Sequence, residues 1–153
     1  MNRRQRDSNG AGVLLSAPGV CIKDTGTAKG RGVFALRAFA AGEEVEVCPV
    51  LLFRMPLKRL PAEFRRFVYD WAQLAGARGT NALALGYGSM YNHSNPANLR
   101  YEADASGSLL RLFAARAVAA GEELTINYNV PDGESEPEDD YWFEMNGVTP
   151  IDG

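Results

Sequence analysis

The sequence predicts a mainly β fold, α+β by element count, made of small sheets with one main helix. Short apolar runs rich in β-branched residues alternate with Gly- and Pro-containing turns over most of the chain. Only the stretch from Pro61 to Gly76 spaces its apolar residues three and four apart. With 153 residues, 46% of them apolar, the chain can bury one core of its own, so we expect a single domain.

The first residues are polar and rich in Arg, and we expect residues 1–19 to be a flexible segment before a domain spanning 20–130. The apolar run Val13 to Leu15 is too short for a signal or membrane helix. We therefore expect no membrane partner and a cytoplasmic location, or a nuclear one if the source is eukaryotic or viral. Val20 to Lys23 is predicted to be the first strand, before the Gly- and Thr-rich residues 24–32.

One thirteen-residue pattern occurs twice. Val33 to Val45 and Leu112 to Leu124 are identical at nine of thirteen positions. Each copy predicts a strand, a connector, an Ala-Gly-Glu turn and a second strand, and Gly42 and Gly121 supply the positive φ of that turn. Two copies are too few for a solenoid, so we expect two similar β units at either end of the domain.

The remaining elements follow from local patterns. Pro61 suits the first position of the predicted helix, in which Phe64, Phe67, Val68, Trp71 and Leu74 share one face. The other predicted elements are a strand at Glu44 to Phe53, where Pro49 indicates an edge or a bulge; a buried strand at Ala82 to Leu85; a hairpin of Leu99 to Ala103 and Leu109 to Ala114; and a last strand at Glu123 to Tyr128.

The segment from Gly86 to Asn98 is dense in turn-forming residues and holds the only histidine, His93. An ordered loop with this composition is typical of a functional site. Two simpler interpretations exist. Asn92-His93-Ser94 fits an N-glycosylation sequon, which matters only in a secreted chain, and an Asn-rich turn can use its histidine merely to satisfy backbone groups.

The C-terminal part, residues 131–153, combines an acidic loop with an aromatic cluster. Asp132 to Asp140 contains six acidic residues, and without them the net charge of −3 would be +3. The run is either a solvated loop or a field that attracts a basic peptide. The apolar side chains of Tyr141 to Met145 should fold back onto the domain, or simply cap its core.

Two classes of site are not favoured by the sequence. Cys21 and Cys48 stand apart from each other, with no Cys-x-x-Cys pair, so we expect buried thiols in a reducing compartment and no metal site. We see no basic patch with interleaved aromatic residues and therefore expect no direct binding of nucleic acid.

Three motifs in order carry a family resemblance: Lys29-Gly-Arg-Gly-Val-Phe-Ala35, Tyr91-Asn-His-Ser-Asn-Pro-Ala-Asn98 and Gly121-Glu-Glu-Leu-Thr-Ile-Asn-Tyr128. Together they resemble the SET-domain protein-lysine methyltransferases over roughly residues 20–145. Because the usual cysteine-rich zinc segments are absent, the chain is similar to the minimal viral and bacterial members. The resemblance implies a β-clip-like fold in which the C-terminal segment forms a pseudoknot.

The resemblance also implies the site. S-adenosylmethionine would be the cofactor, and a lysine-bearing basic protein or peptide the partner. Tyr128 corresponds to the catalytic tyrosine. The implied cofactor-binding residues are Lys29, Gly30, Arg31, Gly32, Met90, Tyr91, Asn92, His93 and Trp142, and the implied substrate-binding residues are Tyr87, Tyr101 and Phe143.

Methyl transfer to lysine gives these residue types a reason. The reaction needs a neutral amine in line with the sulfonium methyl group, whereas a free lysine has a pKa near 10.4. Burial in an aromatic channel next to positive sulfur lowers that pKa, so no second histidine is needed as a base. Asn127 replaces a common Asp, and the proline of the His93 loop comes one place early. The alternative function is a catalytically silent SET-like module that binds a lysine-bearing peptide; the oligomeric state is open, with a dimer possible.

Overall fold

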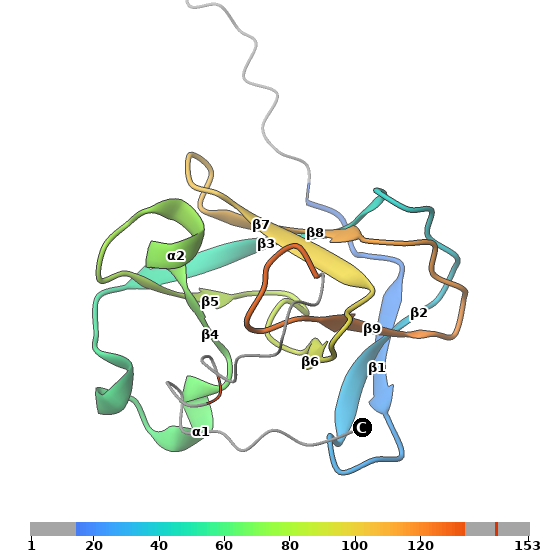
Figure 1. The fold of residues 1–153 in the computed structure, drawn as a ribbon, viewed down its shortest axis with the longest axis horizontal. Coiled ribbons are helices and arrows are strands. Elements are labelled where there is room, and N and C mark those ends of the chain that lie inside the picture. The colour runs from blue at the N-terminus through green and yellow to red at the C-terminus, as the bar shows by residue number, and fades with distance from the viewer. Residues whose placement is uncertain (1–14, 134–142, 144–153) are drawn as a thin grey trace, which may run out of the picture.

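The computed structural model describes residues 15–133 and Phe143, and its strands form two small sheets (Figure 1). The four-stranded sheet has the order β1-β2-β9-β6, and the five-stranded sheet has the order β4-β5-β3-β8-β7. The first sheet contains β1 (Val20–Asp24), β2 (Arg31–Ala35), β6 (Asn92–His93) and β9 (Glu123–Ile126). The second contains β3 (Glu44–Phe53), β4 (Val68–Asp70), β5 (Asn81–Ala84), β7 (Leu99–Asp104) and β8 (Leu109–Ala114). The mainly β prediction is confirmed.

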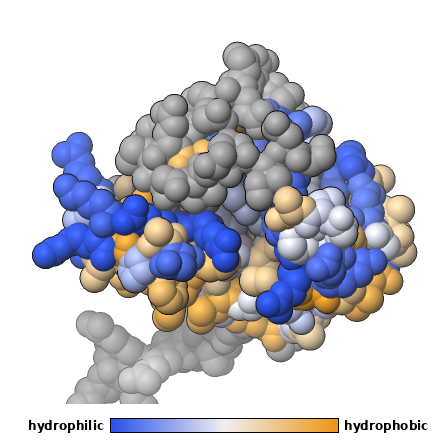
Figure 2. All heavy atoms as spheres, turned by 90° about the horizontal axis from the view of Figure 1, so that it is seen from below, coloured by the Kyte–Doolittle hydropathy of each residue, from blue (hydrophilic) through white to orange (hydrophobic). Residues whose placement is uncertain are grey.

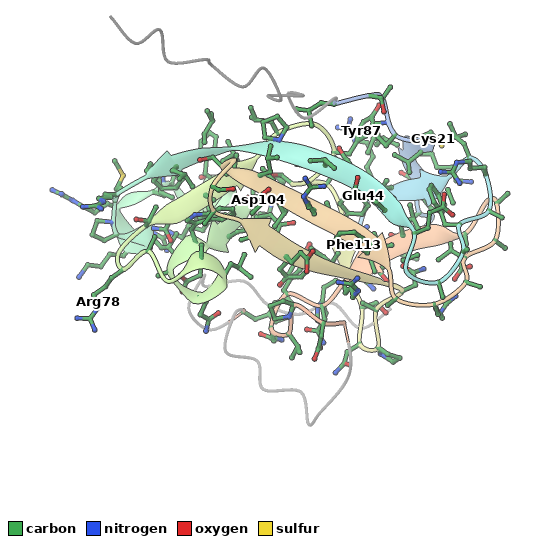
Figure 3. All side chains as sticks on the ribbon, turned by 90° about the horizontal axis from the view of Figure 1, so that it is seen from above. Cys21, Glu44, Arg78, Tyr87, Asp104 and Phe113 are labelled. Carbon is green, nitrogen blue, oxygen red and sulfur yellow. The ribbon has the colours of Figure 1, made fainter. Side chains whose placement is uncertain are left out.

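The core contains residues from both sheets. Val33, Leu99, Leu110, Leu112 and Leu124 have no exposed surface. They come from four different strands, so the hydrophobic effect ties both sheets into one unit. Figure 3 shows β3 curving over the β7–β8 hairpin. That hairpin pairs Leu99 with Ala114 through Asp104 with Leu109, as the sequence predicts.

Pro49 lies inside β3, which is a central strand and not an edge strand. Up to and including Pro49, β3 pairs with β8, and from Val50 onward it pairs with β5. At this change of partner the Leu85 N–H donates to the Pro49 carbonyl at 2.9 Å, and the proline nitrogen can return no hydrogen bond. The one register irregularity lies between Glu44 and Glu46, so the prediction of an edge or bulge at Pro49 is wrong.

The two copies of the repeated pattern pair with each other. The N–H groups of Phe39 and Val118 each donate to the other's carbonyl at 2.9 Å. Gly42 donates to Ala114 and Gly121 donates to Ala35, both at 2.7 Å, and both glycines have positive φ, 81° and 85°. The turn of each copy therefore closes on the strand of the other, which gives the repeat an approximate twofold arrangement.

The predicted helix from Pro61 to Gly76 does not form as one element. The structure has η1 (Leu57–Arg59), then α1 (Ala62–Arg65), strand β4, and α2 (Trp71–Ala75). β4 pairs with β5, and Val68 is buried in that pairing. Pairing with a distant strand therefore overrides the local helical spacing. Asp70 caps α2 through the Gln73 N–H, and Gly76 ends it in the left-handed conformation, as predicted for the helix end.

The His93 loop and the end of the domain lie together. Residues 86–89 form turns, and the two-residue strand β6 then pairs in parallel with β9, Asn92 opposite Thr125 and His93 opposite Ile126. After β9 the chain runs beside β7, where Tyr101 N–H donates to Pro131 and Ala97 N–H to Gly133. The described part of the C-terminal segment thus passes between the His93 loop and β7. No helix within residues 15–133 is long and apolar enough to cross a membrane.

Candidate active site

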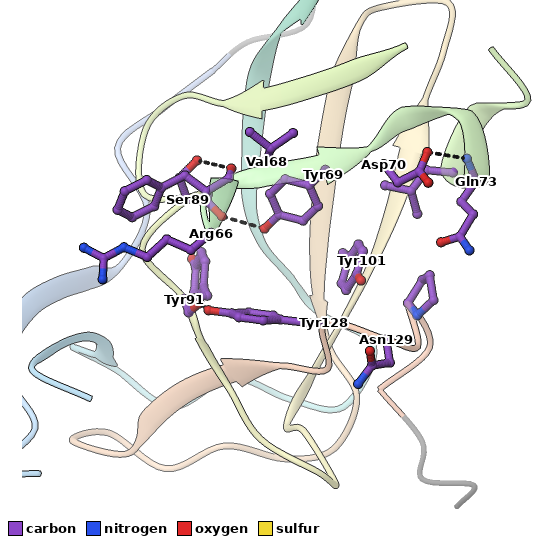
Figure 4. A pocket seen from close by; sticks show the side chains of 14 residues that line it. Arg66, Val68, Tyr69, Asp70, Gln73, Ser89, Tyr91, Tyr101, Tyr128 and Asn129 are labelled. Atoms are coloured by element: carbon purple, nitrogen blue, oxygen red, sulfur yellow. Dashed lines mark hydrogen bonds between the residues drawn. The ribbon is translucent and has the colours of Figure 1, made fainter. Parts of the chain in front are cut away.

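A pocket opens between β4, β7 and the segment after β9, and tyrosines dominate its wall (Figure 4). It contains about 510 Å³ of space, part of it open to solvent. Tyr69, Tyr91, Tyr101 and Tyr128 come from four separate segments. The other lining residues are Arg66, Phe67, Val68, Asp70, Gln73, Leu74, Gly88, Ser89, Asn129 and Pro131.

Three of these tyrosines point their hydroxyl groups at backbone carbonyls. Tyr69 donates to Gly88 at 2.6 Å, Tyr101 to Asn127 at 3.0 Å and Tyr128 to Tyr91 at 2.7 Å. A phenol oxygen can accept hydrogen bonds as well as donate one, so the wall combines donor and acceptor chemistry. A ligand with N–H groups, such as an amine, is the chemical match for such a wall.

The phenols of the pocket are held in the neutral form. Burial raises the pKa of Tyr69, Tyr101 and Tyr128 well above the ordinary value, and burial followed by the nearby Glu46 carboxylate does the same for Tyr91. For Tyr128, the charge of Arg66 partly opposes the rise. None of these tyrosines is ionised near neutral pH, so they act as hydrogen-bonding groups and not as phenolate bases.

The Asn92-His93 pair lies directly against Tyr128. The Tyr128 backbone N–H donates to His93 Nδ1 at 3.1 Å, because the parallel β6–β9 pairing places the two segments side by side. Asn92 Nδ2 donates to Glu123 Oε1 at 2.8 Å and to the Arg31 carbonyl at 3.2 Å. The three motifs of the sequence are therefore joined at one place.

The Gly30-Arg31-Gly32 segment is tied to this junction. Gly30 has a φ of 74°, which favours glycine. A Cβ atom on Gly32 would lie 2.9 Å from Asn92 Nδ2 and still closer to Glu123 Oε1, so a larger residue there would displace these two side chains. Lys29 Nζ donates to the His93 carbonyl at 3.3 Å, which places a cation beside the His93 loop.

The other predicted site residues do not all lie at the pocket. Phe143 is buried, with its ring centroid 4.9 Å from that of His93 and 5.8 Å from that of Tyr128. Tyr101 lines the pocket, but Tyr87 does not; its N–H donates to Glu46. Met90 N–H donates within the turn to the Tyr87 carbonyl. Trp142 and most of the acidic run lie outside the described residues.

Sequence reasoning misses three residues of the site. Tyr69 lines the pocket because β4 breaks the predicted helix, and Arg66 lies at the pocket for the same reason. Glu46, only 6% exposed, accepts hydrogen bonds from the Tyr91 hydroxyl at 2.7 Å and from Tyr87 N–H. The Asp-x-x-Gln capping pattern at Asp70 and Gln73 was a signal for the helix break. An acidic residue on the buried face of a predicted strand was the signal for Glu46.

Comparison with known proteins agrees with this geometry. Residues 30–129 match the model of the SET domain. The chain belongs to the SET-domain family of protein-lysine methyltransferases. A curated relative from Schizosaccharomyces pombe, named as a histone-lysine N-methyltransferase specific for H3 lysine-37, is 32% identical over 126 residues, covering 80% of this chain and 76% of the relative.

Solved structures of SET enzymes share the fold. A Plasmodium falciparum protein assigned as a histone methyltransferase superposes with a TM-score of 0.60 at 23% identity, over 72% of this chain and 93% of that one. A humanized mutant of the Chaetomium thermophilum Polycomb Repressive Complex 2 gives a TM-score of 0.57 at 21% identity, over 74% of this chain and 15% of that one. Both likenesses confirm the fold of this SET-domain chain.

Proposed function

We propose that this SET-domain chain transfers a methyl group from S-adenosylmethionine to the ε-amine of a lysine in a basic protein of the histone class. One observation carries the proposal: the tyrosine-lined pocket reaches Tyr128, whose backbone N–H is hydrogen-bonded to His93 at 3.1 Å. A lysine pocket and a cofactor segment would share this one residue, as a direct transfer between two bound molecules requires.

The residues around Asn92 and His93 fit the cofactor. S-adenosylmethionine supplies a methyl group made electrophilic by a positively charged sulfur. Lys29 and Arg31 offer cations to its carboxylate, and the absence of side chains at Gly30 and Gly32 lets the backbone come close. Asn92 and His93 offer polar side chains beside that segment. The proposed cofactor-binding roles of Met90, Tyr91 and Trp142 rest on the family resemblance.

The pocket residues would prepare the amine. Apolar ring surface removes water from around a lysine side chain and so favours its neutral form. The hydroxyl oxygens of Tyr69, Tyr101 and Tyr128 can accept N–H groups and direct the nitrogen lone pair. Because these phenols stay neutral, the proton of the lysine ammonium would leave to solvent before transfer, with no protein base of high strength involved.

A histone-class substrate is suggested by the S. pombe relative, whose name specifies H3 lysine-37. The target of this chain need not be the same lysine. Asp132, which is exposed, begins the acidic run proposed to attract a basic peptide. The localisation that fits such a substrate is nuclear, if the source is a eukaryote or a virus, and cytoplasmic otherwise.

The test is transfer of labelled methyl from S-adenosylmethionine to histone proteins and to a lysine-bearing peptide array, with calorimetric titration of the cofactor in parallel. We expect the chain to bind S-adenosylmethionine and to transfer its labelled methyl group to lysine. Cofactor or peptide binding without turnover on any substrate would favour the silent SET-like module. Turnover only on non-histone peptides would mean that the chain methylates lysine but that histones are not its substrates.

A further inference from the structure

A basic segment, Arg54 to Arg66, stands out from an otherwise acidic chain. Five of its thirteen residues are cationic and one, Glu63, is acidic, so it carries +4 while the whole chain carries −3. The cationic residues are Arg54, Lys58, Arg59, Arg65 and Arg66. It contains η1 and α1, and Figure 2 shows hydrophilic residues gathered at the left, over these two elements.

The cations of the basic segment differ in their partners from four arginines elsewhere in the chain. Arg37, Arg100, Arg111 and Arg116 each form an ion pair with a carboxylate, with N–O distances between 2.5 and 3.8 Å. Within the part of the chain that the structure describes, no cation of the basic segment forms an ion pair. Among residues 15–133 no carboxylate forms an ion pair with this positive charge, which can therefore act on an anionic partner.

The segment has a fixed backbone shape. Arg65 donates from Nε to the Leu60 carbonyl and from its guanidinium to the Lys58 carbonyl, both at 3.0 Å, and so holds the turn between η1 and α1. Arg54, Lys58 and Arg59 remain exposed around that turn. Phe64 is 59% exposed among these cations, which adds an apolar surface to a positive one.

The basic segment ends at the active site. Arg66 lines the pocket, and in Figure 4 its guanidinium group points away from Tyr101. Arg66 is also close enough for its charge to act on the Tyr128 phenol. A molecule bound along the segment would therefore lie beside the entrance through which a substrate lysine reaches Tyr128.

We propose that the basic segment binds the phosphate backbone of DNA that accompanies the protein substrate; this inference rests on the proposed histone-class function. A lysine-rich substrate is itself repelled by the segment, so the segment suits an anion, and an anion that comes with the substrate would lie beside the pocket entrance. Histones are wrapped by DNA, which presents a regular array of phosphates. Unpaired arginine and lysine side chains on a fixed turn suit that array, and their contacts would be independent of base sequence.

This proposal runs against the sequence-based expectation of no nucleic-acid binding. The expectation followed from the sequence showing no basic patch with interleaved aromatic residues. The break at β4 leaves Phe64 in solvent next to the cations, which gives the basic and aromatic combination that nucleic-acid surfaces use.

The direct test measures binding of the full chain to a fluorescent DNA duplex at several salt concentrations. The variant is Arg54→Gln/Lys58→Gln/Arg59→Gln, which leaves the pocket untouched. The matched control is Arg37→Gln/Arg100→Gln/Arg116→Gln, which changes net charge equally at ion-paired positions. We expect the slope of log K against log salt to fall by about 3 in the variant, one for each lost phosphate contact, and to change little in the control.

Methyl transfer separates this inference from the proposed function. With intact nucleosomes the triple variant should be slower than wild type, while both should turn over a short histone peptide equally. Equal DNA affinity and equal salt slope in wild type and triple variant would overturn the inference and leave the peptide reaction standing. If the triple variant binds DNA more weakly but the wild-type chain methylates no histone, the basic segment is still a DNA-binding surface and the proposed histone substrate is wrong.

Tighter binding of poly-glutamate than of DNA at equal salt would show that the partner is an acidic protein and would overturn the DNA proposal.

Discussion

Tyr128 joins the two halves of the proposed site through two different groups. Its backbone N–H donates to His93 and its hydroxyl donates to the Tyr91 carbonyl at 2.7 Å. The backbone contact does not involve the side chain, so Tyr128→Phe should retain it. The proposed role of the hydroxyl oxygen can therefore be tested while the contact with His93 is kept.

Tyr128→Phe should reduce methyl transfer by about 10² to 10³, because the lost oxygen acts mainly where amine and methyl group align in the transition state. Cofactor affinity should stay near the wild-type value. The measurement is single-turnover transfer of labelled methyl to a lysine peptide, with calorimetric titration of the cofactor alongside.

Tyr101→Phe and Tyr69→Phe are the matched controls. Each removes a hydroxyl that donates to a backbone carbonyl, as Tyr128→Phe also would, so all three variants should lose a similar amount of stability, about 1 to 3 kcal/mol. If either control abolishes transfer while Tyr128→Phe keeps more than about a tenth of it, the assignment of Tyr128 is wrong.

At the scale of single elements, β3 supports the His93 loop through Glu46. The carboxylate accepts from Tyr87 N–H at 2.8 Å and from the Tyr91 hydroxyl at 2.7 Å, at the two ends of the turn that leads to Asn92. Gly86 has a φ of 67°, and a Cβ there would approach Glu46 Oε1 to 2.6 Å. The turn is thus shaped around a buried carboxylate.

Glu46→Ala should lower the free energy of unfolding by about 2 to 6 kcal/mol, because two buried donors each lose a partner at about 1 to 3 kcal/mol. Glu46→Gln should lower it less, since one amide oxygen still accepts a hydrogen bond. Urea unfolding of the three proteins gives the comparison. A Glu46→Ala protein as stable as wild type would mean that water replaces the carboxylate and that the turn does not depend on it.

Elements with local signals could be predicted and those that depend on distant partners could not. The β7–β8 hairpin and the glycine turns of the repeat follow from residues close in sequence. β4 forms only because β5 is beside it, and the two residues of β6 are too few to show any alternation. For the same reason Tyr69 was missed, whereas Asn92, His93 and Tyr128 are marked by motifs.

At the scale of the whole molecule, strand order has no local signal at all. The pairings β2–β9 and β6–β9 join residues about ninety and thirty positions apart, and only the resemblance to a known family implied that the motifs meet. The structure adds an accumulation of tyrosine around that meeting point. Four of the six tyrosines line one pocket, and burial dominates their titration.

This accumulation predicts how the fold responds to alkali. Below about pH 9 the phenols of Tyr69, Tyr91, Tyr101 and Tyr128 are protonated in both folded and unfolded chains, so they give no pH dependence. Above the ordinary tyrosine pKa of 10.0 the unfolded chain releases these protons, whereas the folded chain, whose pKa values are raised by burial, retains them. The unfolded state then binds fewer protons, and stability falls as pH rises.

The expected decline approaches about 5 kcal/mol per pH unit near pH 11, at about 1.36 kcal/mol for each of four phenols. The buried Cys48 thiol, whose pKa burial also raises, should start the decline slightly earlier, near its ordinary value of 9.0. Urea unfolding at intervals from pH 8 to pH 11 measures how stability changes with pH. Tyr101→Phe removes one of the four phenols and should make the decline shallower by about 1.36 kcal/mol per pH unit. Stability that stays constant between pH 9.5 and pH 11 would mean that water reaches these phenols in the folded protein, and the dry lysine channel proposed for methyl transfer would then lose its physical basis.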